Sequence, residues 1–361
     1  MKNVFDITEF GAVGDGTTDC TEAIRSACAA AAQVSGVVEV PPGVYLSGKF
    51  SLSKGVSLEG HSAWSYRSDG GSVIRLNDPG AECLVDITGG FGCSIRNMCL
   101  DGAGLGNGVH GVMLSWPEYN GGSEEDTPSI DDCRIGNFSG DGVHLYHIWC
   151  FSVRHCMLHR NRGAGLFMDG WDGFVLDNWF SGNGNGGFRG GECTASVTMT
   201  GNRVEWNIGG GFIFNRSDNI NITGNFFDRS GGPAILARGG KGNMAREFAV
   251  TGNIFRRDGK PDWRAFDDPF ESSHILLDRC VNWTITGNNF VCGGDDAPGG
   301  TVSPDYSVVF GNSKCLIIRN NTMWCGAVKQ NIVDRGGNIE VSLGENLGEA
   351  VRDKSHWWPE F

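Results

Sequence analysis

The 361-residue sequence contains no long apolar run, and this absence argues against a membrane-spanning helix. The first ten residues, MKNVFDITEF, also lack the apolar core of a secretory leader, so we expect a cytoplasmic protein, with a secreted mature form as the alternative. Basic residues are few: 29 Lys and Arg against 42 Asp and Glu give a net charge of -13, which argues against nucleic acid as a partner. The same charge disfavours a strongly polyanionic polymer unless a local basic groove overrides it.

No CxxC pair occurs among the 13 cysteines, and their number is odd. We therefore expect small thiol side chains that fill the core in a reducing compartment, with Cys133 and Cys156 buried and reduced. His144 and His147 would point to opposite faces of one strand, which does not favour metal binding. The sequence predicts no metal site and no cofactor.

Helical periodicity is missing from most of the chain, and a Gly- and Asn-rich pattern repeats in its place from Trp149 to Gly239. Short alternating apolar runs point every second side chain inward, which is typical of strands. One column of the repeat falls at Cys156, Asn178, Asn202 and Asn225, with steps of 22, 24 and 23 residues. A repeat of this length predicts stacked rungs of three short strands. The fold class is all-β, a right-handed parallel β-helix.

Asparagine suits the corner of each rung because it tolerates turn geometry and its amide can hydrogen-bond along the stack. Later members of the column are expected at Asn253, Asn288 and Asn321. We predict one domain over 1–361. Residues 1–60 form a cap and the first rungs, 61–335 the remaining rungs, and 336–361 a last rung and an aromatic tail.

The N-terminal cap should contain a helix, because Asp19 and Glu22 have capping-box spacing and an Ala-rich run follows them. Such a helix would cover the open end of the solenoid, where strand edges are otherwise unpaired. FGAVGDGTTD, this helix and VEVPPGVYLSG together resemble the opening of the pectate-lyase-like β-helix superfamily. That superfamily includes polygalacturonase-related glycosidases, inulin fructotransferases, mannuronan epimerases and phage tailspikes.

Two further segments are similar to enzymes of this superfamily. FMDGWDG resembles the NTDGxD motif of polygalacturonases, with Asp169 and Asp172 at the matching positions, although the double Asp and the GHG turn of that family are absent here. IFRRDG and TGNNF look similar to later rungs of inulin fructotransferases. The resemblance implies a saccharide substrate and a site near Asp169.

Outward positions on the first strand of each rung carry the candidate site. With Leu166, Phe188 and Phe212 facing inward, charged and polar groups line one outer face. Glycosidic cleavage needs a carboxylic acid and a second carboxylate. Asp169 and Glu192 lie one rung apart, and a rung spacing of about 4.8 Å sets their carboxyl groups roughly 5–7 Å apart.

Glu205 and Asp228 form a second candidate pair, in equal register after the asparagine column. Stacked carboxylates raise a pKa at functional sites, and the alternative is that Arg203, Arg229 or Arg256 neutralises them. Both pairs stay open as the catalytic residues. The side chains expected to bind substrate are His144, Tyr146, Trp171, Asp172, Arg189, Trp206, Asn215, Arg216 and Arg238.

The leading hypothesis is an enzyme that cleaves or transfers a glycosidic bond in an oligosaccharide or polysaccharide through paired carboxylates. One alternative is β-elimination, in which Arg189 or Arg216 neutralises a uronate. Others are a fructotransferase-type transglycosylation and a glycan-binding β-helix without activity. No nucleic acid or membrane partner is expected, and the flat glycine-rich edges and aromatic tail predict a homo-oligomer, a trimer or a dimer.

Overall fold

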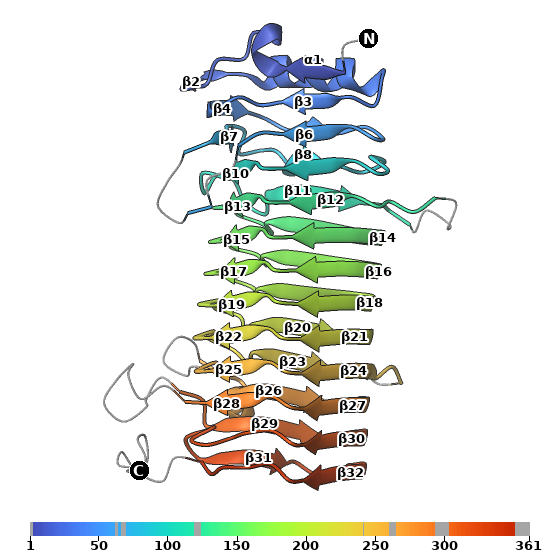
Figure 1. Ribbon diagram of the computed structural model, residues 1–361, viewed down its shortest axis with the longest axis vertical. Coiled ribbons are helices and arrows are strands. Elements are labelled where there is room, and N and C mark those ends of the chain that lie inside the picture. Colours follow the sequence, from blue (N-terminus) through green and yellow to red (C-terminus); the bar gives the residue numbers. More distant parts are fainter. Residues whose placement is uncertain are drawn as a thin grey trace. The chain divides into compact units, whose positions relative to one another are not determined.

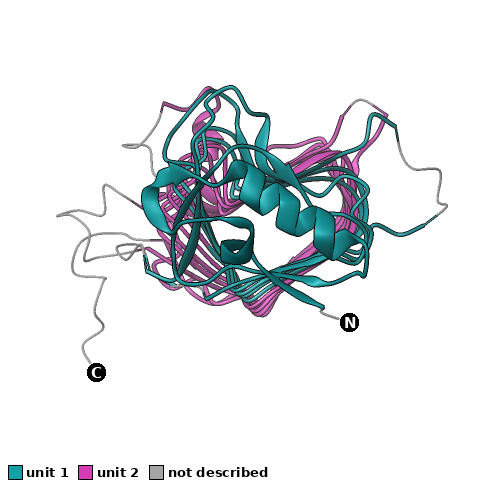
Figure 2. Ribbon diagram, turned by 90° about the horizontal axis from the view of Figure 1, so that it is seen from above, with its two compact units in different colours: residues 1–179 teal, residues 180–361 magenta. Residues whose placement is uncertain are grey.

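The computed structural model describes residues 3–350 apart from 62–63, 66–69, 119–123, 241, 260–264 and 293–302. The chain forms two compact units, 1–179 and 180–361, and within each unit rung stacks upon rung (Figures 1 and 2). The single domain expected over 1–361 stays a prediction. The aromatic tail at 351–361 lies outside the described residues, as do parts of the long loops.

The chain begins with a cap in unit 1. It contains the short 3₁₀ helix η1 (Ile7–Phe10) and one α-helix, α1 (Thr21–Ala32). Buried Ile24, Ala27, Cys28 and Ala31 lie on one face of α1, so this helix packs on the first strands. The capping-box prediction was wrong: the N-cap is Cys20, which makes no side-chain capping bond, and the Asp19 carboxylate accepts from the Thr21 N–H at 3.0 Å.

Short parallel strands make up the rest of unit 1. They are β1 (Val4–Asp6), β2 (Asp15–Asp19), β3 (Val37–Glu39), β4 (Gly43–Ser47), β5 (Phe50–Ser51), β6 (Ser57–Glu59), β7 (Ser72–Leu76), β8 (Cys83–Asp86), β9 (Ser94–Arg96), β10 (Cys99–Asp101), β11 (His110–Ser115), β12 (Ser129–Asp131), β13 (Arg134–Gly136), β14 (Val143–Arg154), β15 (Met157–His159) and β16 (Leu166–Leu176).

Unit 2 repeats the same elements. After β17 (Trp179–Ser181) come β18 (Phe188–Thr200), β19 (Arg203–Glu205), β20 (Phe212–Asn215), β21 (Asp218–Thr223), β22 (Phe226–Asp228), β23 (Ile235–Arg238), β24 (Ala245–Thr251), β25 (Ile254–Arg256), the 3₁₀ helix η2 (Pro269–Glu271), β26 (Ser273–Asp278), β27 (Cys280–Thr286), β28 (Asn289–Val291), β29 (Tyr306–Gly311), β30 (Lys314–Arg319), β31 (Gln330–Asp334) and β32 (Ile339–Gly344).

Each rung contributes to two kinds of sheet. One set of strands, which includes β10, β13 and β15 in unit 1, stacks in parallel as one sheet, called sheet B here. The remaining strands form sheet A, again with parallel pairing, as between β14 and β16. In β14 the expected first and second strands run on as one bent strand, and the bend coincides with left-handed backbone at His147 (φ 59°) and Cys150 (φ 59°).

The core lies inside the rungs, as the period-two pattern predicts. Leu145 pairs with Met168 in the ladder of unit 1, and both side chains are fully buried. In unit 2 the rings of Phe227, Phe255 and Phe290 stack at 5.0 and 4.7 Å on successive rungs. Alternation therefore fixes which side chains face inward, and the parallel β-helix fold is confirmed.

Corner hydrogen bonds confirm the asparagine column. In unit 2 the Asn202 and Asn225 backbone N–H groups each donate at 2.9 Å to the next side-chain oxygen, on Asn225 and Asn253. Unit 1 uses cysteine in this column: the Cys156 N–H donates to Asn178 Oδ1 at 2.9 Å, and the Cys133 N–H meets Cys156 Sγ at 3.4 Å. Because each amide satisfies a buried N–H of the rung before it, the column holds the rungs in register.

All thirteen cysteines are free thiols, and Cys133 and Cys156 are buried as predicted. Burial raises the pKa of the Cys133 thiol, which keeps this side chain neutral. None of the helices in the described part of the chain is long and apolar enough to cross a membrane.

Candidate functional site

The outward face of sheet A in unit 1 carries ionisable side chains. His144 on β14 lies opposite Phe167 on β16, and two residues further on Tyr146 lies opposite Asp169. Leu145 between them points into the core. Alternation along β14 therefore brings His144 and Tyr146 to the same outward face, as the sequence predicted.

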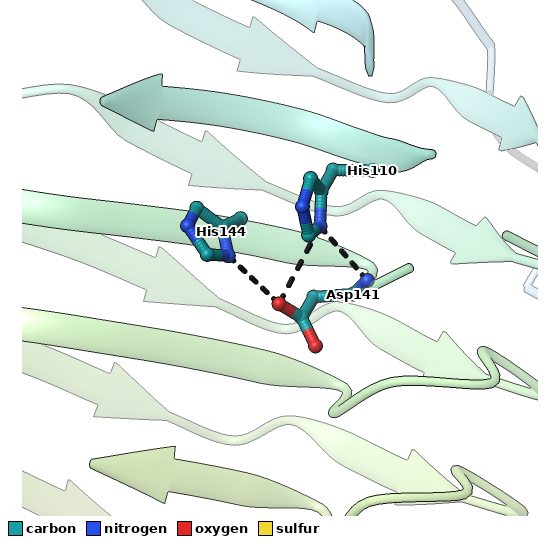
Figure 3. A group of neighbouring side chains, drawn as sticks. All are labelled: His110, Asp141 and His144. Carbon is teal, nitrogen blue, oxygen red and sulfur yellow. Dashed lines mark hydrogen bonds and ion pairs between the residues drawn. The ribbon is translucent and has the colours of Figure 1, made fainter. Parts of the chain in front are cut away.

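His144 belongs to a cluster with Asp141 and His110, which meet at the start of two sheet A strands (Figure 3). The His144 Nδ1 lies 2.7 Å from Asp141 Oδ2, and the His110 Nδ1 lies 3.4 Å from the same oxygen. The Ala164 N–H donates to the other Asp141 oxygen at 2.7 Å. Since a carboxylate only accepts, the neutral His144 donates through Nδ1 and its Nε2 remains a proton acceptor.

The ring of His144 is held from both sides. The His110 ring lies 4.2 Å from it between centroids, and the Phe167 ring lies 4.6 Å away on the next rung, tilted by only 15°. Parallel rungs thus stack three rings, which fixes the orientation of the imidazole. A histidine oriented by a carboxylate in this way is suited to accept a proton in general base catalysis.

Glycines make room for this cluster. A Cβ on Gly163 would lie 2.2 Å from Asp141 Oδ1, and a Cβ on Gly140 would lie 2.8 Å from His110 Nδ1. Both contacts are shorter than van der Waals separations. The glycines of SGDG and NRGAG therefore allow neighbouring loops to approach the Asp141 carboxylate closely.

Protonation differs between the two histidines. The Asp141 N–H donates to His110 Nδ1 at 2.9 Å, so His110 carries its proton on Nε2. Burial, followed by the neighbouring His144, lowers the pKa of His110 to about 4. His110 therefore stays neutral at pH 7 and packs as an uncharged ring against His144.

The same three side chains offer ligand atoms within 4.8 Å of one another, a spacing that could hold a cation. A metal on His110 Nδ1 would displace the Asp141 N–H that this atom accepts. The hydrogen bonds account for the cluster without an ion, and the expectation of no metal stays a prediction.

A basic pocket lies on the same three loops. Residues 102–109, 137–142 and 160–165 connect sheet B to sheet A in successive rungs of unit 1. At their sheet A end they hold His110, Asp141 and His144, and at their sheet B end they line a pocket of about 480 Å³. Its charged and larger lining residues are Arg75, Asp101, Asn137, Phe138, Arg160 and Arg162.

The predicted site residues of unit 1 divide by burial. Asp169 holds the expected outward position of the ladder, opposite Tyr146, but it is only 4% exposed, and Gly170 (φ 138°) follows it directly in β16. Trp171 is 39% exposed, as a sugar platform would be. Asp172 accepts the indole N–H of Trp149 at 3.0 Å, an interaction that places this carboxylate on the surface of the second part of β16.

In unit 2 the pair Glu205 and Asp228 lies in register on β19 and β22, as predicted, and both are buried. Arginine neutralises them. Arg203 pairs with Glu205 at 2.9 Å, and the guanidinium of Arg257, which is 1% exposed, grips both Asp228 oxygens at 2.9 and 2.8 Å.

Arg229 also pairs with Asp228, and its guanidinium lies over the Trp206 ring at 5.0 Å. Neutralisation by arginine, the alternative that the sequence left open, therefore describes Glu205 and Asp228, with Arg257 in place of Arg256. Such a network holds the rungs together, and both carboxylates are engaged in it.

The remaining candidates of unit 2 are also engaged. Glu192 is exposed and pairs with Arg216 at 2.6 Å, and Arg238 pairs with the buried Glu271 at 2.6 Å. Asn215 donates to the Gly190 carbonyl at 3.4 Å. Arg189 lies half-buried on the outward face of β18. Glu192 lies in unit 2 and Asp169 in unit 1, so their role as an acid–base pair stays a prediction.

Sequence reasoning missed His110 and Asp141. A signal was present, because GNGVH at 106–110 and GDGVH at 140–144 are nearly the same pentapeptide. The ladder nevertheless pairs Met113, not His110, with His144. Aligning the two pentapeptides would put His110 opposite His144, but the strand register is shifted from that alignment by three residues and brings His110 beside Asp141. The sequence alone does not give this register.

Comparisons with known proteins agree with this architecture. Residues 85–255 match the family model described as a right-handed beta helix region. Over 97 residues the chain is 33% identical to the non-secreted LysM effector LysM19 of Penicillium expansum, a match that spans 24% of this chain and 8% of that protein.

Solved structures align over nearly the whole chain. The A-module of mannuronan C-5 epimerase AlgE4 from Azotobacter vinelandii is 18% identical with a TM-score of 0.72, covering 96% of this chain and 99% of the module. DFA-IIIase from Arthrobacter chlorophenolicus A6, without its lid and in complex with GF2, is 17% identical with a TM-score of 0.64, covering 96% and 93%. The Dettilon tailspike protein is 16% identical with a TM-score of 0.58, covering 92% of this chain and 68% of the tailspike. At such identities the likeness concerns the fold alone, and the chain has the right-handed parallel β-helix fold of pectin-lyase-like proteins.

Proposed function

We propose that this chain is an enzyme that acts on an acidic polysaccharide, with His144 as the general base. The observation that carries the proposal is the 2.7 Å contact between His144 Nδ1 and Asp141 Oδ2 on an outward face of unit 1. Through it the carboxylate would fix the tautomer and stabilise the imidazolium formed when Nε2 takes a proton.

The reaction class follows from what surrounds this histidine. In a uronate, the proton on the carbon next to the carboxylate is the acidic one, and a base that removes it starts either β-elimination or epimerisation. Tyr146 lies on the same outward face of β14 and could give or accept a second proton. The mannuronan C-5 epimerase of similar fold acts, by its name, on mannuronan.

The second candidate is cleavage or transfer of a glycosidic bond. Asp169 favours it, because this buried carboxylate lies opposite Tyr146 in the ladder, two residues before the exposed Trp171. Glu192 would be its partner, whereas the Arg257 clamp on Asp228 argues against the Glu205 and Asp228 pair.

One assay separates these reactions. The protein is incubated in deuterated water with a uronate oligomer, and with a fructan oligomer in parallel, and the products are followed by absorbance, mass and reducing ends. Elimination yields an unsaturated product that absorbs in the ultraviolet, and epimerisation yields deuterium in an oligomer of unchanged length. New ends without absorbance would support the second candidate, and no change with any saccharide would favour a binding scaffold.

We further propose that the chain works as a homo-oligomer, a trimer or a dimer, in a reducing compartment such as the cytoplasm. The thirteen free thiols support the compartment, ten of them being buried. The expected association rests on the glycine-rich segment of the sequence at 209–211. Sedimentation across micromolar concentrations checks the subunit number, and a monomer throughout would contradict it.

A further inference from the structure

We propose that the basic pocket of unit 1 is a binding subsite for a carboxylate-bearing sugar unit of the substrate, an inference that rests on the proposed function. The pocket lies at the sheet B end of the loops whose sheet A end holds His110, Asp141 and His144. A chain of sugars bound along these loops would reach both places. The pocket would thus hold another unit of the same bound chain.

The floor of the pocket is a fixed carboxylate. Asp101 accepts from the Ala103 N–H and the Asn137 amide, each at 3.0 Å, and from Arg75 Nε at 2.8 Å. These bonds lower the pKa of Asp101 against the opposing effect of burial, so it remains an anion. Asp101 therefore neutralises Arg75. Arg160 and Arg162, the other two cations that line the pocket, have no second carboxylate among the lining residues to neutralise them.

Arg160 and Arg162 supply those cations. Both are exposed, and in the described part of the chain neither side chain makes a hydrogen bond or an ion pair. The Arg162 N–H donates to the Phe138 carbonyl at 2.9 Å, and Arg160 has left-handed backbone (φ 54°), so the loop holds the two residues in place through its main chain. Three arginines against one aspartate give the pocket an excess of two positive charges.

This local charge opposes the charge of the whole protein, which is -13. A positively charged concave site on a negatively charged protein attracts a ligand whose negative charge lies on the part that enters the pocket. Guanidinium groups match carboxylates through paired N–H donors. At about 480 Å³, the pocket is within the range of small-molecule sites and suits a short acidic saccharide.

The test measures binding without turnover. Arg160→Gln/Arg162→Gln removes two charges that stabilise nothing else in the described fold. Arg96→Gln/Arg154→Gln is the matched control: it removes two charges at a different place in unit 1, where both side chains flank Asp131 and are about equally exposed, 52% and 55%. Calorimetry with a uronate tetramer, a neutral hexose tetramer and inorganic sulfate gives Kd for each form, all in a His144→Gln background.

We expect the uronate tetramer to bind at least tenfold more tightly than the neutral tetramer, and the pocket variant to lose about tenfold or more. The control should stay within about twofold. Equal affinity for both tetramers, or an unchanged Kd in the pocket variant, overturns the subsite, as does sulfate competing as well as the uronate. If the parent protein binds the uronate tetramer but does not turn it over, the proposed function is refuted and the subsite stands. If it turns the uronate over and the pocket variant binds it unchanged, the subsite is refuted and the proposed function stands.

Discussion

The outward faces of sheet A differ sharply between the two units, although both are built from the same rung. In unit 1 this face carries His144, Tyr146 and Asp169. In unit 2 one column on this face is apolar, and Phe270 and Tyr306 pack against it. The column consists of Ile213, Leu236, Leu276, Val309 and Val333. Stacking of the rungs constrains only the inward side chains. The outward face can therefore carry ionisable groups in unit 1 and an apolar column covered by Phe270 and Tyr306 in unit 2.

Sheet B shows a second contrast at equal positions. Asp101 and Asp228 are each the last residue of a three-residue strand. In unit 1 the neighbouring positions along the column are Arg75 and Gly136, and a pocket opens beside them. In unit 2 the neighbouring positions are Glu205 and Arg256. Arg257, the residue after β25, donates to both Asp228 oxygens, where Asn137, the residue after β13, donates to Asp101 in unit 1. An asparagine or an arginine directly after the strand thus distinguishes the pocket of unit 1 from the clamp of unit 2.

The largest effect is expected on activity. His144→Gln removes the base from the unit 1 face, and the initial rate on the acidic substrate should fall by about 10²–10⁴-fold, roughly 3–5 kcal/mol in the barrier. His155→Gln is the control, since His155 makes a like contact with Asp132 at 2.6 Å on another surface. A rate loss of equal size in both variants would rule out a special role for His144.

The next effect concerns stability in unit 2. Asp228→Asn leaves the guanidinium of Arg257 buried without its charge partner, which should cost about 3–5 kcal/mol of unfolding free energy. Asp101→Asn in unit 1 should cost only about 1 kcal/mol, because Arg75 reaches solvent. Urea unfolding measures both, and equal costs would contradict the contrast between clamp and cavity.

Leu236→Ala tests whether the covered face of unit 2 is a stability surface. This side chain is only 8% exposed, and its loss should cost about 2–4 kcal/mol. Met113→Ala, in the ladder position next to His144 in unit 1, should cost less than about 1 kcal/mol because the side chain is half-buried. Thermal melting compares them; a more costly Met113 variant would reverse the interpretation.

Corner columns offer a smaller contrast. Asn225→Ala removes the acceptor of the Asn202 N–H and should cost about 1–3 kcal/mol. Cys156→Ala in unit 1 removes only a weak sulfur acceptor and a small apolar group, so we expect about 1 kcal/mol. The denaturant midpoint of each variant, compared at an unchanged m-value, measures its loss of unfolding free energy. If the Cys156 variant loses as much as the Asn225 variant, the Cys156 sulfur is as good an acceptor for the corner N–H as the asparagine oxygen.

Acid should destabilise both units modestly. Burial lowers the pKa of His159 to about 4 and that of His274 to about 3, whereas unfolded histidine titrates near 6.5. The unfolded chain therefore binds more protons below about pH 6.5, and stability is full above that pH and falls as the pH drops toward 4. Between pH 7 and 5.5 each histidine should remove about 1 kcal/mol.

A matched variant isolates the unit 2 part of this pH effect. His274 lies beside the stacked rings of Phe255 and Phe290, with ring centroids 6.2 and 5.8 Å away, so His274→Phe keeps an aromatic group there and removes the titration. The acid slope of unfolding free energy should become shallower in this variant. An unchanged slope would mean that other groups cause the acid sensitivity.

The rungs follow from periodicity in the amino-acid sequence. Alternating apolar residues have one arrangement that buries them, so the pattern is sufficient to set Leu145, Met168 and Phe212 inward, where all three are buried. The spacing of Asn202, Asn225 and Asn253 likewise predicts the corner column, because each amide must satisfy a buried N–H of its neighbour.

The partnerships among outward side chains follow from the tertiary structure instead. His110 and Asp141 lie 31 residues apart and meet because the strand register is shifted by three residues from the GxGVH motif. Arg257 reaches Asp228 across 29 residues from the loop that follows β25. Inward positions are set by the burial of apolar side chains, and the sequence shows this as a local, periodic pattern. Contacts between outward side chains depend on the paths of the loops and on the register between rungs, which a periodic pattern does not specify.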